Sequence, residues 1–244
     1  MSQTIARAIS IIDFLSEDAR SLNEVAAHLD VHRSTALRQL QTLEAARYAL
    51  RRSDGRFAVG PRLIAIAQRA LDGLNVRQVA APHLRVLHET TGHTVHLAQL
   101  LGDEIIYIDK VDGAASVRLY SRIGKPASLH ASGVGKVILS QLSEARRQAL
   151  LGGVEWVAHT PNTHVNAETL TADLDRIAQR GWGVDDGEFE AFVNCIAVPV
   201  SNSNGDVAAA ISVTSIKAIA SLTDLMTLLP HLQRTAETVS RELG

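Results

Sequence analysis

Cysteine, aromatic residues and long apolar runs are all scarce in this sequence of 244 residues. Cys195 is the only cysteine, so an intramolecular disulfide is excluded and nothing points to an oxidising compartment. Aromatic residues make up 4%, which argues against stacking platforms for single-stranded nucleic acid. The N-terminal MSQTIARAIS lacks the apolar core of a signal peptide, and no apolar run approaches membrane-spanning length. We therefore expect a cytoplasmic protein with no membrane partner.

Charge is nearly balanced overall, at −2, but it is unevenly distributed. Residues 31–62 contain seven arginines and two acidic residues, a net of +5, whereas the residues after position 75 carry a net of −4. A basic patch on an otherwise acidic protein is typical of a nucleic-acid contact surface. The hydrophobic content of 46% is that of a globular protein, and the length allows one large domain or two ordinary ones.

The segment Ser21–Leu43 predicts two short helices joined by a tight turn. Ser21 and Glu24 have the spacing of a capping box, and Asp30, which tolerates left-handed backbone, marks the turn. The inward face of the second helix is expected to comprise Leu37, Leu40 and Leu43. Its outward stripe comprises Ser34, Thr35, Arg38 and Thr42. Because these side chains can bond phosphates and base edges, the segment predicts a helix-turn-helix whose second helix enters a DNA major groove.

The flanking residues extend this motif. Residues 4–16 have the apolar spacing of another helix, and residues 48–52 and 56–59 are strand-like around Asp54-Gly55, a strong hairpin signal. Three helices and a basic hairpin predict a winged helix-turn-helix, with the hairpin arginines placed for backbone or minor-groove contact. His32 could contact phosphate or simply begin the helix. The candidate DNA-binding residues are His32, Arg33, Ser34, Thr35, Arg38, Thr42, Arg51, Arg52 and Arg56.

Three parts are expected: the winged helix-turn-helix (1–60), an apolar linker helix (61–75) and a second domain (76–244). The linker helix begins at Gly60-Pro61 and is apolar enough to pack against a partner subunit or the next domain. Strands of the second domain are expected at 94–101, 104–111, 116–123, 182–185, 194–200 and 207–215. Helices are expected at 76–91, 131–142, 167–179 and 221–243, and a further helix is expected to begin at Ser143. The helix at 221–243 is expected to be kinked or divided at Pro230. The pattern predicts an α+β domain built on one antiparallel sheet.

Three stretches together resemble the IclR family of transcriptional regulators, over essentially the whole chain. They are HRSTALRQLQTLE before the hairpin, GKPASLHASGVGKVIL at 124–139, and GWGVDDGEFEAFVNCIAVPVSNSNGDVAAAISVTS at 181–215. The chain departs from the family pattern at Asp30 and Arg47, where members usually have glycine. It departs again at Thr214, where many members have serine.

The resemblance implies a bacterial regulator, not an enzyme, with a GAF-like effector domain and no cofactor. It implies a homodimer, or a dimer of dimers, that binds a palindromic operator in double-stranded DNA and responds to a small organic acid. Most members repress, so we expect a repressor of a catabolic operon. The implied effector-binding residues are Gly133, Val134, Asp185, Cys195, Ser212 and Thr214. The backbone N–H groups of the first two, at a helix start, suit a carboxylate.

Other chemistries fit less well. Gly133–Lys136 lacks the glycine spacing and the Ser/Thr of a nucleotide-binding loop, so Lys136 is interpreted as structural or exposed. No histidine or acid is identifiably paired with Cys195, and the spacing of His88, His93 and His96 matches no standard zinc pattern, so no metal is expected. Two alternatives remain open: a constitutive DNA-binding protein with a structural second domain, and a DNA-targeted enzyme.

Overall fold

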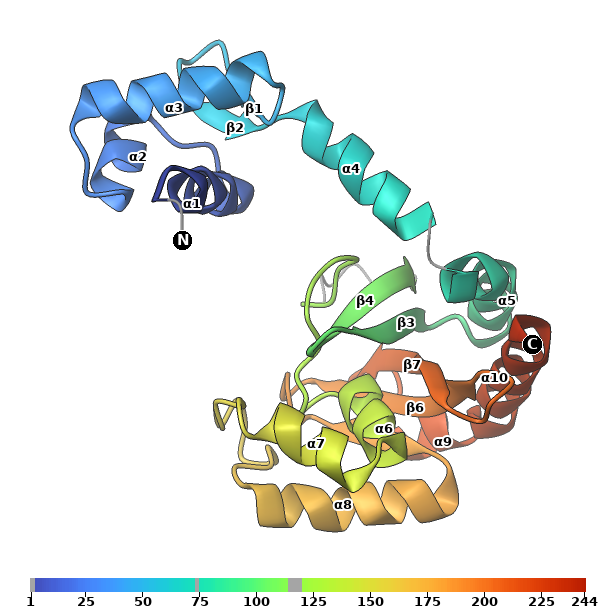
Figure 1. Ribbon diagram of the computed structural model, residues 1–244. Coiled ribbons are helices and arrows are strands. Elements are labelled where there is room, and N and C mark those ends of the chain that lie inside the picture. The colour runs from blue at the N-terminus through green and yellow to red at the C-terminus, as the bar shows by residue number, and fades with distance from the viewer. Residues whose placement is uncertain (1–2, 73–74, 114–119) are drawn as a thin grey trace. The chain divides into compact units, whose positions relative to one another are not determined.

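In the computed structural model the chain forms two compact units, Met1–Gly73 and Leu74–Gly244 (Figure 1). The structure describes residues 3–72, 75–113 and 120–244. Within these ranges, no helix is both long and apolar enough to cross a membrane.

The first unit consists of helices around a small core, followed by a hairpin and a further helix. Its elements are α1 (Gln3–Glu17), α2 (Leu22–His28), α3 (Arg33–Ala45), β1 (Ala49–Arg51), β2 (Phe57–Val59) and α4 (Pro61–Asp72). The buried core comprises Ile11, Leu15, Val25, Ala26, Ala36, Leu40, Ala49 and Phe57. Two backbone hydrogen bonds between Arg20 and Phe57, of 2.7 and 2.8 Å, tie the hairpin to the segment before α2. The predicted helix-turn-helix with a wing is confirmed.

The turns around α2 and α3 use the predicted local chemistry. The Ser21 hydroxyl accepts the Glu24 N–H, and the Glu24 carboxylate accepts the Ser21 N–H at 2.8 Å, which closes the capping box. Asp30 and Arg47 have φ values of 49° and 63°, so both turns adopt left-handed backbone without glycine. One prediction is wrong: Leu37 lies outside the core, because the stripe that faces inward begins at Ala36 and recurs at Leu40.

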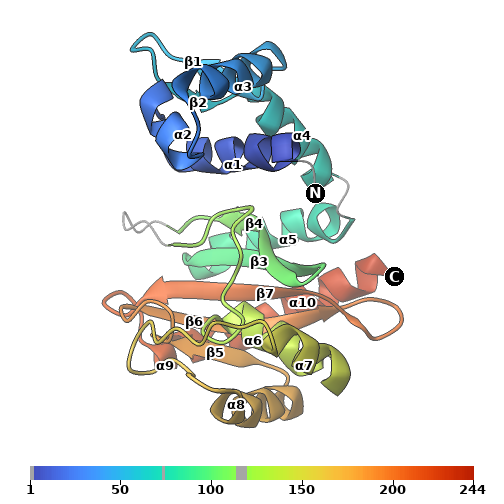
Figure 2. The same ribbon diagram turned by 60° about the vertical axis from the view of Figure 1, so that its left-hand side comes forward.

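The second unit is built on a five-stranded antiparallel sheet of order β4-β3-β7-β6-β5 (Figure 2). Its strands are β3 (Thr94–Leu101), β4 (Glu104–Val111), β5 (Gly183–Asp186), β6 (Val193–Ser201) and β7 (Val207–Ile216). The strand predicted at 116–123 falls partly on residues 114–119, outside the described residues, and Tyr120–Ile123 are not in a strand. The chain meets the β4 edge just afterwards through an isolated bridge at Pro126, which has no N–H to donate to a continuous ladder.

Helices cover both faces of this sheet (Figure 1). The helices α5 (Asn75–Thr91) and α10 (Leu229–Leu243) pack together on one face, and α6 (Gly133–Gln141) packs on the other with α8 (Ala167–Arg180) behind it. The remaining helices are α7 (Glu144–Leu151) and α9 (Leu222–Met226). The C-terminal helix is divided, as predicted, and Pro230 lies in the first turn of α10, where its missing N–H leaves no bond unmade.

Candidate functional site

The first candidate site is the exposed face of α3. His32 caps this helix, because its Nδ1 accepts the Ser34 N–H at 3.3 Å. Ser34, Arg38 and Thr42 are exposed at intervals of four residues, so they share one helix face, and Thr35 beside them is half-buried. The Thr42 hydroxyl donates to the Arg38 carbonyl at 2.9 Å, which leaves its methyl group and an oxygen lone pair for an outside partner. This face carries the predicted stripe, and its contact with DNA stays a prediction.

The three wing arginines differ in how they are held. Arg51 and Arg52 are exposed, and the Arg51 guanidinium lies 5.7 Å from the centre of the Phe57 ring. Arg56 is engaged inside the unit, because it donates to the Ala19 carbonyl at 3.1 Å and lies 3.5 Å from the Glu24 carboxylate. Arg51 and Arg52 are therefore freer than Arg56 to reach a nucleic acid.

The second candidate site is a pocket in the second unit. The residues that the sequence resemblance suggested for an effector all line it: Gly133, Val134, Asp185, Cys195, Ser212 and Thr214. The free space is about 510 Å³ with the solvent at its mouth included.

Strand register assembles the floor of this pocket. Asp185 on β5 pairs with Cys195 on β6, and Cys195 pairs with Thr214 on β7. Ser212 lies two residues before Thr214 and pairs with His96 on β3. Because directly paired residues, and residues two apart on a strand, point to the same face, the polar side chains form one row across four strands.

The start of α6 forms the opposite wall. Ser132 caps the helix, and its hydroxyl accepts the Gly135 N–H at 3.1 Å. A Cβ atom on Gly133 would lie 3.0 Å from the Cys195 sulfur and 3.4 Å from the Ala197 Cβ, so glycine lets the helix start approach the sheet closely. A helix N-terminus carries partial positive charge and free N–H groups, which favour a negatively charged group here.

Burial sets the protonation of the pocket groups. Asp185 is 5% exposed, and burial raises the pKa of its carboxyl to about 7, although its Oδ1 accepts the Glu188 N–H at 2.6 Å. Burial raises the pKa of the Cys195 thiol to about 12 and raises the pKa of the Tyr107 phenol. The pocket is thus lined by neutral thiol and hydroxyl groups beside one carboxyl that titrates near neutrality.

Sequence reasoning missed the role of His96. It is buried in the pocket, with Nε2 2.7 Å from the Ser121 hydroxyl and Nδ1 3.3 Å from the hydroxyls of Ser212 and Thr214. Burial lowers the pKa of its imidazole to about 3, so the ring is neutral. The alternation of β3 could have predicted its inward direction, but the sequence indicated His96 only as one of three candidate zinc ligands. Tyr107, Ser121 and Ser132 also line the pocket and were likewise missed.

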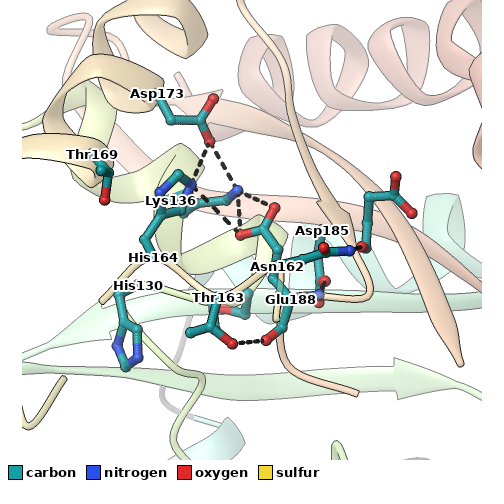
Figure 3. A network of polar contacts seen from close by, with 12 residues as sticks. His130, Lys136, Asn162, Thr163, His164, Thr169, Asp173, Asp185 and Glu188 are labelled. Atoms are coloured by element: carbon teal, nitrogen blue, oxygen red, sulfur yellow. Dashed lines mark hydrogen bonds and ion pairs between the residues drawn. The ribbon is translucent and has the colours of Figure 1, made fainter. Parts of the chain in front are cut away.

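A buried ion-pair network lies next to the pocket (Figure 3). Lys136 is fully buried, and its Nζ lies 2.6 Å from both Glu188 carboxylate oxygens and 2.9 Å from Asp173 Oδ2. His164 Nε2 lies 3.5 Å from the same Asp173 oxygen. Burial raises the pKa of Asp173, but hydrogen bonds from His164 and Lys136 outweigh it and hold that pKa well below its usual range. The structural interpretation of Lys136 is confirmed.

The same network bears on the question of a metal. Within the described ranges, one group of three metal-ligand side chains is found, formed by His164, Asp173 and Glu188. The Lys136 ammonium bonds both carboxylates, so it supplies the positive charge that a cation would bring. Among the three histidines considered from the sequence as zinc ligands, His88 uses its Nδ1 to bond the His93 backbone carbonyl at 2.9 Å.

The network also holds the pocket wall in place. Glu188 belongs to the loop of residues 187–192, which contributes Phe189 and Glu190 to the pocket. The Thr160 hydroxyl donates to the Gly187 carbonyl at 2.6 Å. The Thr163 hydroxyl donates to the Glu188 carbonyl, also at 2.6 Å (Figure 3). Lys136 on α6 therefore joins the helix start and this loop, the two walls that a ligand would touch.

Comparison with known proteins identifies one family for both units. The IclR helix-turn-helix domain model matches residues 4–53, and the model of the C-terminal domain of the bacterial transcriptional regulator IclR matches residues 68–241. The chain is 32% identical to the regulator XynR of Escherichia coli over 99% of this chain and 97% of that one. It is 31% identical to the E. coli repressor AllR over 87% of this chain and 80% of that one.

Solved structures show the same architecture. The IclR protein of Thermotoga maritima has a TM-score of 0.84 at 32% identity, with both chains covered completely. A regulator from Rhodococcus sp. RHA1 has a TM-score of 0.88 at 28% identity, covering 100% of this chain and 98% of that one. The two-domain prediction, a helix-turn-helix unit and an α+β unit on an antiparallel sheet, is confirmed. This chain belongs to the IclR family of bacterial transcriptional regulators.

Proposed function

We propose that this regulator represses a catabolic operon and responds to a small organic acid bound in the pocket of the second unit. The observation that carries the proposal is the convergence of Asp185, Cys195 and Ser212 with the N-terminus of α6 around one cavity. The N–H groups of Gly133 and Val134 are suited to a carboxylate, and the hydroxyls on β7 are suited to the rest of a polar ligand. An IclR homologue from Microbacterium hydrocarbonoxydans, of the same fold, was solved with 4-hydroxybenzoate, itself a small carboxylic acid.

The proposed DNA site is the α3 face together with the wing. Arg38 and Ser34 are placed to reach base edges, and Arg51 and Arg52 to reach the backbone of double-stranded DNA. His32, Arg33, Thr35, Thr42 and Arg56 complete the proposed surface. A bacterial transcription factor acts where the chromosome lies, so we place the protein in the cytoplasm.

We propose that the regulator assembles as a homodimer, or a dimer of dimers, on a palindromic operator. In α4, Ile64 is 71% exposed and Ile66 is 39% exposed, and a second copy could cover the helix face that carries Ile64. Dimerisation there would set the spacing of the two recognition helices. Light scattering on Ile64→Glu should show a smaller particle than the wild type; an unchanged mass would move the interface elsewhere.

An enzyme is the weaker alternative. Ser121 and His96 lie at the 2.7 Å distance of a nucleophile and its base. The imidazole is a poor base, because burial lowers its pKa to about 3, and its other nitrogen faces hydroxyls instead of a carboxylate. The Cys195 thiol, with a pKa raised to about 12, is equally unsuited as a nucleophile. The other alternative, a structural second domain without a ligand, is disfavoured by the polar groups that converge on the pocket.

Thermal-shift screening against small carboxylic acids and sugar acids tests the proposed effector. An acid at about a hundred times its Kd should stabilise the protein by about 2.7 kcal/mol, because it binds only the folded state. The shift should be absent in Asp185→Ala and present in Asp186→Ala, which changes the neighbouring exposed carboxylate. A panel in which no acid raises the unfolding temperature would contradict the proposal.

A further inference from the structure

The charge inventory of the pocket conflicts with an acidic ligand. Among the lining residues that the structure describes, none is lysine or arginine, and two are acidic, Asp185 and Glu190. Asp185 is buried on the floor and Glu190 is half-buried on the wall. A carboxylate that binds at the start of α6 therefore enters a site that already holds a buried carboxyl group.

Three lysines of the described part of the second unit, Lys136, Lys110 and Lys125, have partners elsewhere. The Lys136 ammonium bonds Glu188 and Asp173, so its charge is compensated inside the ion-pair network (Figure 3). Lys110 lies 2.7 Å from Asp112, and the Lys125 ammonium lies 4.4 Å from the centre of the Tyr120 ring. None of these three lysines lines the pocket. The described lining thus offers helix N–H groups and hydroxyls, and no full positive charge.

Two carboxylates held close together in a buried site cannot both stay ionised, because their repulsion is little screened and neither is solvated by water. We propose that the pocket takes up its acid together with one proton, held on Asp185, so that Asp185 donates a hydrogen bond to the bound carboxylate instead of repelling it. This inference rests on the proposed function, since it concerns the form in which the proposed acid is recognised.

The surroundings of Asp185 are consistent with this role. Burial raises the pKa of its carboxyl to about 7, so the proton can be gained and lost in the physiological range. Of the charged groups that act on it, Glu188 raises this pKa further and Lys136 lowers it. The other titratable groups that line the pocket are Cys195 on β6, Tyr107 on β4 and His96 on β3, together with Tyr120 and Glu190. The first three are neutral near pH 7, so Asp185 is the carboxyl on the pocket floor whose proton can follow the ligand.

Isothermal titration calorimetry on the full-length protein tests the inference. The probes are glycolate, lactate, glycerate, gluconate and 4-hydroxybenzoate, each with its uncharged amide. For an acid that binds, Kd should rise by about tenfold from about pH 7.5 to 8.5, because Asp185 is ionised there and must take up a proton before the acid can bind. Below about pH 6.5 Kd should be constant, because Asp185 already holds the proton. The buffer supplies the proton, so the binding enthalpy at about pH 8 should differ between phosphate and Tris. The difference should equal the difference in buffer ionisation enthalpy for about one proton.

Asp185→Asn supplies the decisive variant, because its amide keeps an acceptor for the Glu188 N–H and adds a permanent donor. It should bind the acid with the affinity that the wild type shows at low pH, without pH dependence and without proton uptake. Asp186→Asn, on the neighbouring exposed carboxylate, should keep the wild-type pH profile. If Asp185→Asn fails to fold, the wild-type proton uptake alone decides.

The outcomes separate the two proposals. Binding of an acid with a Kd that is constant from about pH 6 to 8.5 and no proton uptake would overturn the inference and leave the proposed function standing. Binding of the amides alone, or of no probe, would overturn the proposed acid effector and the inference with it.

Discussion

The two sites of this regulator use charged groups in opposite ways. On α3 and the wing, Arg38, Arg51 and Arg52 are exposed, and their charges face solvent. In the second unit, Lys136 and Glu188 are buried within 2.6 Å of each other. Exposed charges are screened and contribute little to folding, so they are available to a polyanion. Buried charges must be paired, so they fix the shape of a site instead.

The largest effect is expected from breaking the buried network. Lys136→Met removes the ammonium that bonds both Glu188 and Asp173, and leaves His164 and Arg176 as the remaining partners. Glu188 then loses its buried cation, so the free energy of unfolding should fall by about 3–5 kcal/mol in urea denaturation. Lys217→Met is the matched control, because Lys217 lies 2.8 Å from Asp186 in a partly exposed pair and should cost less than about 1 kcal/mol. Equal losses in the two variants would contradict the contrast between buried and exposed charge.

The next effect concerns pH. The folded-state pKa of Asp185, about 7, lies above its ordinary 3.8, so the folded protein holds more protons between these values. The contribution of neutral Asp185 to the free energy of unfolding is fully present below about pH 4 and is lost as pH rises through about 7. The loss is on the order of 4 kcal/mol. Urea denaturation across this range should show that loss in the wild type relative to Asp185→Asn. Parallel stability profiles of the two proteins would show that Asp185 is ionised throughout.

A smaller effect is expected at the DNA surface. Arg38→Ala should weaken operator binding by about 1–3 kcal/mol and relax the base preference at one position if Arg38 contacts a base. Arg241→Ala, an exposed arginine of α10, is the control and should leave binding unchanged. Electrophoretic mobility shifts on a footprinted operator provide the measurement. Wild-type affinity and base preference in Arg38→Ala would remove this residue from the interface.

The smallest effect is local. Arg47 has a φ of 63°, in the left-handed region that costs a non-glycine residue about 1–2 kcal/mol. Arg47→Gly removes this strain but adds freedom to the unfolded chain, so we expect a net stabilisation of about 1 kcal/mol or less. Ala46→Gly, at a φ of −84°, should destabilise instead. Thermal unfolding measures both, and destabilisation by Arg47→Gly would show that the arginine side chain has a stabilising role.

The sequence predicted the first unit well because its signals are local. The exposed stripe with Arg38 follows from helical periodicity, and the wing follows from Asp54-Gly55. The error at Leu37 arose because successive residues three apart do not stay on one face of a helix with about 3.6 residues per turn. Ala36, four residues before Leu40, faces the core instead.

The pocket could not be predicted from local signals. Asp185, Cys195 and Thr214 meet only through strand register, so residue type and spacing alone did not bring them together; the family resemblance did. His96 was missed because its partner hydroxyls lie 25, 116 and 118 positions away in the sequence. The Lys136 network was hidden for the same reason, since its carboxylates lie 37 and 52 residues away.

Operator affinity with and without the acid found by thermal shift tests most directly whether the pocket controls DNA binding. The wild type should change its operator Kd when the acid is saturating, whereas Asp185→Ala should show the wild-type unliganded Kd and no response to the acid. Asp186→Ala should behave as the wild type does. A full response to the acid in Asp185→Ala would contradict the assignment of this pocket as the effector site.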